Sequence, residues 1–167
     1  TYTGSGNRDI DFKGKAITVR SSDPNDPCVV ASTVVNAGGS EVEPHRGFYF
    51  HLYEGPSSVL DGFMITGAYQ NTRVGDQFRG GGIFCIHSSP SIRNCVISGN
   101  FAGEGGGIVI FYGSHAKVYN CKLIGNTSGN WGGGIYIYRQ SSAEVQDCLF
   151  VANHEAGNAA VLPIEAD

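Results

Sequence analysis

The sequence predicts an all-β fold: one solenoid in which short parallel strands wind into stacked coils. Three observations predict it. The composition favours strands and turns, a short motif recurs at nearly constant spacing, and the apolar runs are too short for helices. A unit of about 25 residues that contains several short strands is typical of one coil of a solenoid.

Composition sets the first limits. The chain has 167 residues, of which 41% are hydrophobic, enough for one domain with a core. It holds 25 glycines but only 11 Lys plus Arg, and it is rich in the Val, Ile, Tyr, Asn and Ser of strands and turns. A net charge of −4 without a basic stripe argues against nucleic acid or anionic membrane surfaces as partners. No apolar run has the length of a membrane span.

Three elements recur in step along the chain. The tetrapeptide Gly-Gly-Gly-Ile begins at Gly80, Gly105 and Gly132, with spacings of 25 and 27 residues. Further along each unit stands a second element, an apolar residue followed by two variable residues and a cysteine. It occupies residues 92–95, 118–121 and 145–148. An asparagine comes five residues after each cysteine, at Asn100, Asn126 and Asn153. Because the three elements advance together, they predict three equivalent coils.

Weaker copies flank the regular ones. Residues 47–50 correspond to the Gly-Ile strand and residues 59–62 to the cysteine strand, with Gly62 in the cysteine position. Further expected parts are strands of a first coil at 16–19 and 33–36, a loop insertion at 69–79, and a degenerate terminal coil at 154–167. We therefore expect a single domain over 1–167, with about five coils of 25–35 residues. It reads as a segment of a longer chain, because it begins abruptly at Thr1.

Equivalent residues of successive coils should lie about 4.8 Å apart and form columns. Two inward columns are expected, one of isoleucines and one of cysteines: Ile83, Ile108 and Ile135, and Cys95, Cys121 and Cys148. The cysteines are expected to be small buried core residues, since stacked side chains give poor disulfide geometry and no Cys-x-x-Cys pair exists. The repeated asparagines are expected at a turn, with left-handed backbone and side-chain hydrogen bonds to the next coil.

This pattern of Gly-Gly-Gly-Ile followed by Asn-Cys-x-[Ile/Leu/Phe]-x-x-Asn resembles the right-handed parallel β-helix superfamily, which includes pectate-lyase-like proteins. It most resembles GGGI-type repeat-containing surface and secreted proteins of bacteria, including those with polymorphic-outer-membrane-type repeats. The resemblance implies a right-handed β-helix in an extracellular or cell-surface location. It implies no single activity, because this architecture hosts lyases, hydrolases, binding modules and adhesins.

The outer face of the Gly-Ile strands is unexpectedly apolar. Side chains alternate between inside and outside along a strand, which gives two outer columns: Tyr49, Phe84, Val109 and Tyr136, and His51, Ile86, Phe111 and Tyr138. Strands that are apolar on both faces are expected to be covered on both. Three explanations remain open. The insertion at 69–79 folds over the face, a second subunit covers it in a homo-oligomer, or the exposed aromatic face binds the rings of a polysaccharide.

A second feature borders this face. Arg79, Glu104 and Trp131 each precede a Gly triplet, and Arg46 lies near the equivalent place one coil earlier. Trp131 is the only Trp of the chain, and Trp, Tyr and Arg are common anchors of binding sites. The candidate polysaccharide-binding residues are therefore Trp131, Tyr136, Tyr138, Phe84, Tyr49, Arg79 and Glu104. The competing interpretation is a solvated rim with an Arg79–Glu104 ion pair.

Catalysis in the same groove is the alternative function. A lyase needs a cation and a base, for which Arg46, Arg79 or Arg139 and His51, Tyr136 or Tyr138 are candidates. A hydrolase needs two carboxylates, for which only Glu104 with Asp76 or Glu155 is available. The motifs typical of polygalacturonases, and the dense acidic calcium cluster of many pectate-type lyases, are absent. A structural or adhesin-type segment is the third candidate.

No cofactor is implied by the sequence. The remaining histidines, His45, His87, His115 and His154, fall in different turns and are expected to be solvated. Asp23 and Asp26 lie in a rigid Pro-containing turn where their carboxylates could hold calcium, although their spacing alone is weak evidence for such a site.

Overall fold

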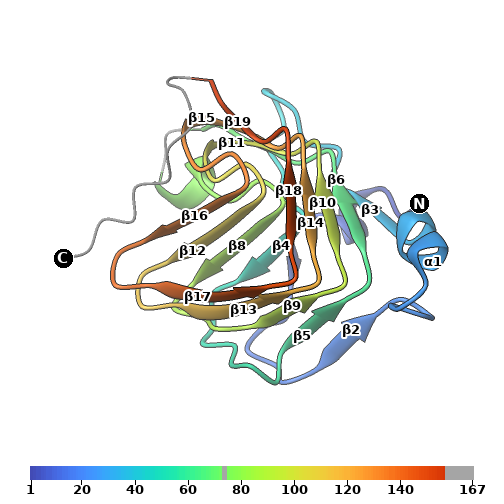
Figure 1. Cartoon of the computed structure of the whole chain (residues 1–167). Coiled ribbons are helices and arrows are strands. Elements are labelled where there is room, and N and C mark those ends of the chain that lie inside the picture. Colours follow the sequence, from blue (N-terminus) through green and yellow to red (C-terminus); the bar gives the residue numbers. More distant parts are fainter. Residues whose placement is uncertain (73–74, 157–167) are drawn as a thin grey trace.

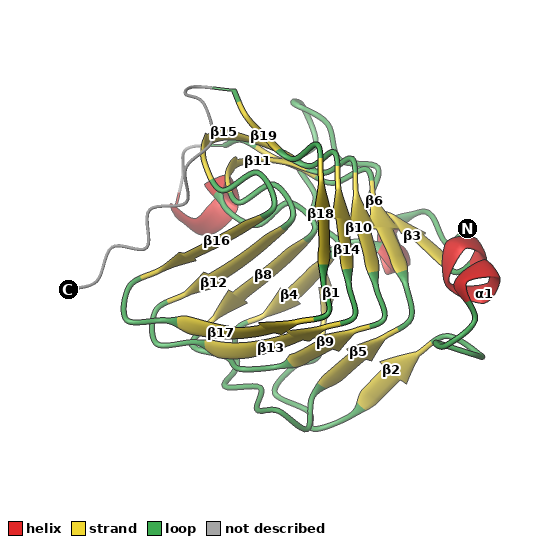
Figure 2. Ribbon diagram, viewed as in Figure 1, coloured by secondary structure: helices red, strands yellow, loops and turns green. Residues whose placement is uncertain are grey.

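The described strands form four parallel sheets around one core (Figures 1 and 2). The structure is a computed structural model that describes residues 1–72 and 75–156. Along each full coil the chain passes through sheets 1, 2, 3 and 4, then returns to sheet 1 beside the preceding strand. Sheet 1 has five strands, as the expected number of coils requires.

The strands are short and are grouped by sheet. Sheet 1 contains β1 (Ile10–Asp11), β4 (Phe48–Phe50), β8 (Ile83–Ile86), β12 (Ile108–Phe111) and β16 (Ile135–Tyr138). Sheet 2 contains β2 (Thr18–Arg20), β5 (Val59–Asp61), β9 (Ser91–Arg93), β13 (His115–Tyr119) and β17 (Ser142–Gln146). Sheet 3 contains β3 (Val34–Asn36), β6 (Met64–Thr66), β10 (Val96–Ser98), β14 (Lys122–Ile124) and β18 (Leu149–Val151). Sheet 4 contains β7 (Tyr69–Gln70), β11 (Phe101–Glu104), β15 (Thr127–Trp131) and β19 (His154–Glu155).

Helical segments are few in the described residues. They are the helix α1 (Pro27–Ser32) and the 3-10 turns η1 (Ser5–Asn7) and η2 (Gly75–Phe78). Pro27 starts α1, and the Asp26 side chain caps it by accepting a hydrogen bond from the backbone N–H of Cys28. Within residues 1–72 and 75–156 no helix has the length and apolar character needed to cross a bilayer.

The predicted inward columns form the core. Ile83, Ile108 and Ile135 occupy one register across β8, β12 and β16, and all three are buried. Cys95 and Cys121 are buried in the same cluster, while Cys148 packs against it half-buried, and all the cysteines are free thiols. Each fully buried aliphatic side chain stabilises the fold by about 1.5–3 kcal/mol. The isoleucine column therefore belongs to the core as expected, and so does the cysteine column except at half-buried Cys148.

Two details of the predicted register are wrong. The Cys95 position of the preceding coil is filled by Phe63, because Leu60 pairs with Ile92 and Asp61 with Arg93. Gly62 instead occupies the corner residue equivalent to Asn94, and both have positive φ. The insertion at 69–79 also begins with a strand, since Tyr69 and Gln70 form β7 and pair with β11.

The predicted asparagine column is confirmed in its hydrogen bonds but not in its backbone. The Nδ2 atom of Asn100 donates to Oδ1 of Asn126 at 3.0 Å, and that of Asn126 donates to Oδ1 of Asn153 at 3.0 Å. The left-handed residue is the one before each asparagine: Gly99, Gly125 and Ala152. The asparagines therefore stabilise a turn that their neighbours make.

Left-handed residues stand at all four corners of the regular coils. Between sheets 2 and 3 they are Asn94, Asn120 and Asp147, and between sheets 4 and 1 they are Gly80, Gly105 and Gly132. These residue types tolerate positive φ. Between sheets 1 and 2 the corner carries larger side chains: Tyr53, His87, Tyr112 and Arg139.

Candidate functional site

The outer face of sheet 1 carries the two predicted outward columns. Tyr49 pairs with Phe84, Phe84 with Val109, and Val109 with Tyr136. Ile86, Phe111 and Tyr138 share a second register. These side chains form an apolar cluster separate from the core. The sequence therefore predicted the direction of both columns correctly.

Most of this face is covered, as expected for strands that are apolar on both sides. Phe84, Val109, Phe111 and Tyr136 are buried, and Tyr49 and Tyr138 are half-buried. Two guanidinium groups account for part of this cover. Cζ of Arg46 lies 4.7 Å from the ring centroid of Tyr49 and 5.0 Å from that of Phe84.

The second guanidinium belongs to the end of the 69–79 insertion. Cζ of Arg79 lies 4.6 Å from the centroid of Phe111. The ring of Phe78 lies against Gly103 of β11, so closely that no side chain fits at that position. The central part of the face is therefore covered by two arginine side chains, of which only Arg79 belongs to the insertion. Phe84 is not available to a ligand.

The predicted rim is brought together as a column. Arg79 pairs with Glu104 through an isolated parallel bridge, and Glu104 pairs with Trp131. Nε of Arg79 donates to Oε2 of Glu104 at 2.6 Å. The carboxylate is buried, so this is not the solvated rim pair that the sequence suggested. An ion pair shielded from water is screened less than a surface pair.

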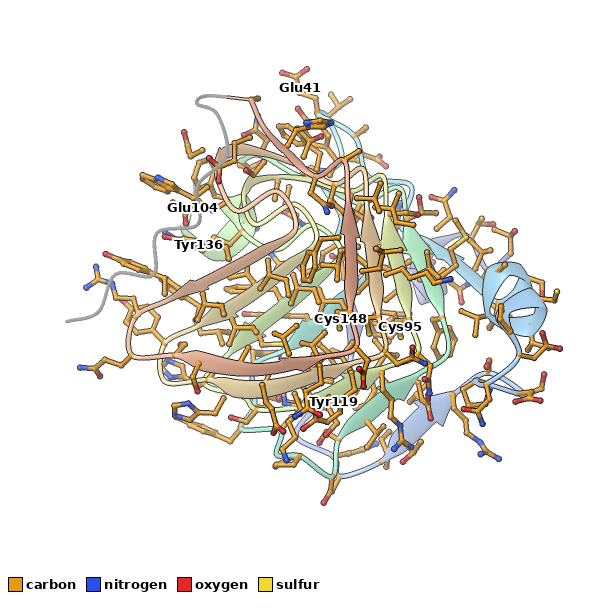
Figure 3. The ribbon with its side chains drawn as sticks, in the orientation of Figure 1. Glu41, Cys95, Glu104, Tyr119, Tyr136 and Cys148 are labelled. Carbon is orange, nitrogen blue, oxygen red and sulfur yellow. The ribbon has the colours of Figure 1, made fainter. Side chains whose placement is uncertain are left out.

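Trp131 is the exposed member of this column. It is 46% exposed, and its ring lies 6.3 Å from that of Tyr136 with an interplanar angle of 17°. Tyr136 in turn lies 5.8 Å from Tyr138, also at 17°. The backbone N–H of Gly132, next to Trp131, donates to Oε1 of Glu155 at 2.7 Å and holds the turn. Figure 3 places Glu104 and Tyr136 on the side of the solenoid where sheet 4 leads into sheet 1.

We name Trp131, Tyr136 and Tyr138 the Trp131 platform. Its three rings are nearly parallel and continue along β16 to Arg139, whose Cζ lies 5.1 Å from the Tyr138 centroid. Because Tyr136 is buried, the rings available to a ligand are those of Trp131 and, in part, Tyr138. The part of the predicted site that a ligand can reach is therefore confined to the last coil.

The candidate lyase residues fall at two separate places: Arg46 and His51 both lie against Tyr49, whereas Arg139 lies against Tyr138. Nε2 of His51 lies 3.2 Å from Oδ2 of Asp11, and its ring stacks on Tyr49 at 4.0 Å. It is three coils from Tyr138, about 14 Å along the solenoid axis. The side chain of Asp76, a hydrolase candidate, lies outside the described residues. Glu104 and Glu155 are held by Arg79 and the Gly132 amide respectively.

Metal ligation has no support in the described geometry. In residues 1–72 and 75–156, no three His, Cys, Asp or Glu side chains are arranged to hold a metal ion. Asp23 accepts a hydrogen bond from the backbone N–H of Asn25, and Asp26 caps α1. Of the histidines expected in turns, His115 begins β13 and His154 begins β19, whereas Nδ1 of His45 lies 2.6 Å from Asp9.

Sequence reasoning missed two features of the corner between sheets 1 and 2. One is Glu54, a buried carboxylate that occurs once and leaves no repeat signal. The other is the ring-bearing series at that corner. His87, Tyr112 and Arg139 each directly follow the last residue of β8, β12 or β16, so aligning the repeats one residue further would have revealed it.

The cysteine column is chemically uneven. The hydrogen bond from the thiol of Cys121 lowers the pKa of the Cys148 thiol to about 6, against the opposing effect of burial. The same hydrogen bond, together with one to Cys95, raises the pKa of the Cys121 thiol well above its usual range. Cys148 is therefore the member of the column that combines a lowered pKa with partial exposure.

Comparison with known proteins identifies the fold family. No curated protein and no solved structure matches the chain. A family model described as a right-handed β-helix region matches residues 61–161, which is more than half of the chain. The four parallel sheets and the columns of equivalent residues agree with that description. The chain belongs to the right-handed β-helix family.

Proposed function

We propose that this chain binds polysaccharide through the Trp131 platform. The observation that carries the proposal is an exposed Trp ring, nearly parallel to two Tyr rings on a rigid strand. Sugar rings present apolar C–H surfaces that pack on such aromatic faces, and the polar groups of Glu104 and Arg79 border the platform. A platform held by strand pairing loses little conformational freedom on binding.

The test replaces the exposed ring. Trp131→Ala should raise the dissociation constant for a bound polysaccharide by about tenfold or more, as loss of a Trp anchor usually does. The free energy of unfolding should change by less than about 0.5 kcal/mol, because the ring lies at the surface. Affinity electrophoresis in gels containing neutral or uronate polysaccharides measures the first effect, and urea unfolding measures the second.

Tyr119→Ala is the matched control, since Tyr119 lies on sheet 2 away from the platform (Figure 3). It should leave migration in every gel unchanged. Retention of the Trp131→Ala variant at wild-type strength would refute the proposal. Mass spectrometry of the polysaccharide after incubation separates binding from turnover. Binding without turnover predicts that the chain length of the polysaccharide stays unchanged.

A structural role is the second candidate, and a different surface favours it. The last coil exposes large apolar side chains: Val145, Leu149, Phe150 and Val151. Phe150 shares the register of the fully buried Leu123, so this surface has the character of an uncovered core. Stacking of another coil would cover it. Light scattering should then show a mass above that of the monomer, and Phe150→Ser should reduce it.

The proposed function also implies where the protein is located. A polysaccharide-binding β-helix is expected to act outside or on the surface of a bacterial cell, where such polymers occur. Three of the five thiols, Cys85, Cys95 and Cys121, are buried, which protects them in an oxidising medium. Fractionation of the source cells with an antibody against this chain tests the location, and a purely cytosolic signal would contradict it.

A further inference from the structure

A row of exposed planar side chains runs along the corner between sheets 1 and 2. We name Tyr53, His87, Tyr112 and Arg139 the corner row. The ring centroids of Tyr53 and His87 lie 6.1 Å apart, and those of His87 and Tyr112 lie 5.5 Å apart. Cζ of Arg139 lies 5.9 Å from the Tyr112 centroid. Tyr53 is 80% exposed and Tyr112 44% exposed, so the row follows four coils at the surface.

Turn geometry does not explain these side chains. All four residues have positive φ, between 49° and 61°. The other corners of the same coils reach this conformation mostly with Gly, Asn or Asp, which adopt it with little strain. Tyr and other bulky residues are rare there, and such outliers concentrate at functional sites. The fold thus requires a left-handed residue at each corner, but not a ring.

The corner row stands on a rigid hydrogen-bonded ladder. Oγ of Ser88 donates to Oε2 of Glu54 at 2.8 Å, and the backbone N–H of Ser88 donates to Oγ of Ser114 at 3.0 Å. The N–H of Ser114 donates in turn to Oγ of Ser141 at 3.2 Å. Both serines are buried; Ser88 directly follows His87, and Ser114 lies two residues after Tyr112. The row is therefore held in place before any ligand arrives.

Positive charge stands at one end of the row and near the other. Arg139 is its last member, and exposed Lys13 has positive φ at the same corner of the first coil. Gly14, which follows Lys13, packs against the backbone of Leu52 beside Tyr53. The nearby carboxylate of Glu54 is turned inward to its hydrogen-bond donors. The exposed charges of the row are thus cationic.

These features define the class of ligand. Rings with polar edges, repeated once per coil, can pack against and hydrogen-bond to successive sugar rings of a polymer. The cations can form ion pairs with carboxylates on such a polymer. Two cations separated by three rings, on a chain of net charge −4, are too few for the phosphates of a nucleic acid. We infer that the corner row binds an acidic polysaccharide running parallel to the solenoid axis. This inference rests on glycan binding as the function, but on residues outside the Trp131 platform.

The test exploits the left-handed backbone. In the triple variant Tyr53→Asn, His87→Asn, Tyr112→Asn, each ring is replaced by a residue that tolerates positive φ. The melting temperature should stay the same or rise. The dissociation constant for polygalacturonate, measured by affinity electrophoresis, should rise by about tenfold or more. Arg139→Gln should weaken binding to polygalacturonate while leaving binding to neutral dextran unchanged.

A control variant on another sheet separates loss of the corner row from a general effect of substitution. Tyr119→Asn, on the outer face of sheet 2, should change neither reading. The inference is overturned if the triple variant binds polygalacturonate as wild type does, if it melts lower with binding intact, or if wild type prefers dextran or single-stranded DNA. Trp131→Ala separates the two proposals. If only Trp131→Ala loses binding, the Trp131 platform is the binding site and the inference about the corner row is refuted. If only the triple variant loses binding, the corner row is the binding site and the proposal for the platform is refuted.

Discussion

Glu54 shows how one side chain that repeats nowhere can organise a repeating fold. It is 1% exposed, and its carboxylate accepts hydrogen bonds from the backbone N–H groups of Gly14 and Leu52 and from the hydroxyl of Ser88. These donors come from three successive coils. Burial opposes its ionisation, but the hydrogen bonds outweigh burial and lower the pKa of Glu54 below its ordinary value of 4.5.

This residue gives the fold a defined acid dependence. Because the pKa of Glu54 is lower in the folded chain than in the unfolded chain, its contribution is complete above the ordinary pKa of 4.5 and is lost as the pH falls through the lower folded value. Glu54→Gln should reduce the free energy of unfolding at neutral pH by about 2–3 kcal/mol and flatten its decline in acid. Urea unfolding across the acid range measures both. Glu41→Gln is the control, since Glu41 is exposed and projects outward (Figure 3); an equally steep decline in both variants would contradict the assignment.

Cys148 carries a second prediction at the residue scale. The thiol of Cys121 donates to it and lowers its pKa to about 6, so Cys148 is largely thiolate at neutral pH. Iodoacetamide should therefore label Cys148 at pH values where buried Cys85 and Cys95 stay unlabelled. Mass spectrometry of the labelled peptide gives its rate against pH. Cys121→Ala should move that profile toward higher pH, and an unmoved profile would show that the hydrogen bond has no such effect.

At the scale of elements, what the sequence could predict follows the repeats. In the regular coils the strands of sheets 1, 2 and 3 follow the Gly-Ile and cysteine motifs, because repetition sets which side chains stack in columns. The sheet 4 strands β11 and β15 contain neither motif and were not predicted. The error at Gly62 arose where Phe63 replaces the cysteine that marked the register. The cover over the outer face was unpredictable because the repeats set where Arg46 and Arg79 lie along the chain, but not that their guanidinium groups fold over Phe84 and Phe111.

The asparagine column predicts a gradient of stability between coils. Asn126 donates to the carbonyl of Ile97 and to Asn153, and it accepts from the backbone N–H and the side chain of Asn100. Asn126→Ala leaves these buried groups without partners and should destabilise the fold by about 2–4 kcal/mol. Asn153→Ala, at the half-buried last coil, should reduce the free energy of unfolding clearly less than Asn126→Ala does. Equal losses in chemical unfolding would mean that the column acts only locally.

At the scale of the whole molecule, the described residues form a solenoid with a covered middle and a more exposed last coil. Each interior strand is paired on both sides, as β14 is with β10 and β18, whereas within residues 1–72 and 75–156 β18 is paired with β14 alone. Leu123 on β14 is buried, whereas Phe150 in the same register on β18 is 47% exposed. Because stability in a solenoid is mainly a sum of contacts between neighbouring coils, the last coil should open more readily than the middle.

Amide hydrogen exchange tests this gradient directly. In dilute solution the N–H groups of β18 should exchange faster than those of β14. The difference should be at least about tenfold if a neighbouring coil raises the free energy of local opening by about 1.4 kcal/mol. The two strands match in length and register, so each serves as the other's reference. Protection of β18 that rises with protein concentration, while that of β14 stays constant, would mean that a second copy covers the last coil and would favour the structural role. Equal protection at every concentration would show that the exposed side chains of this coil are not a weak point, and would refute the gradient.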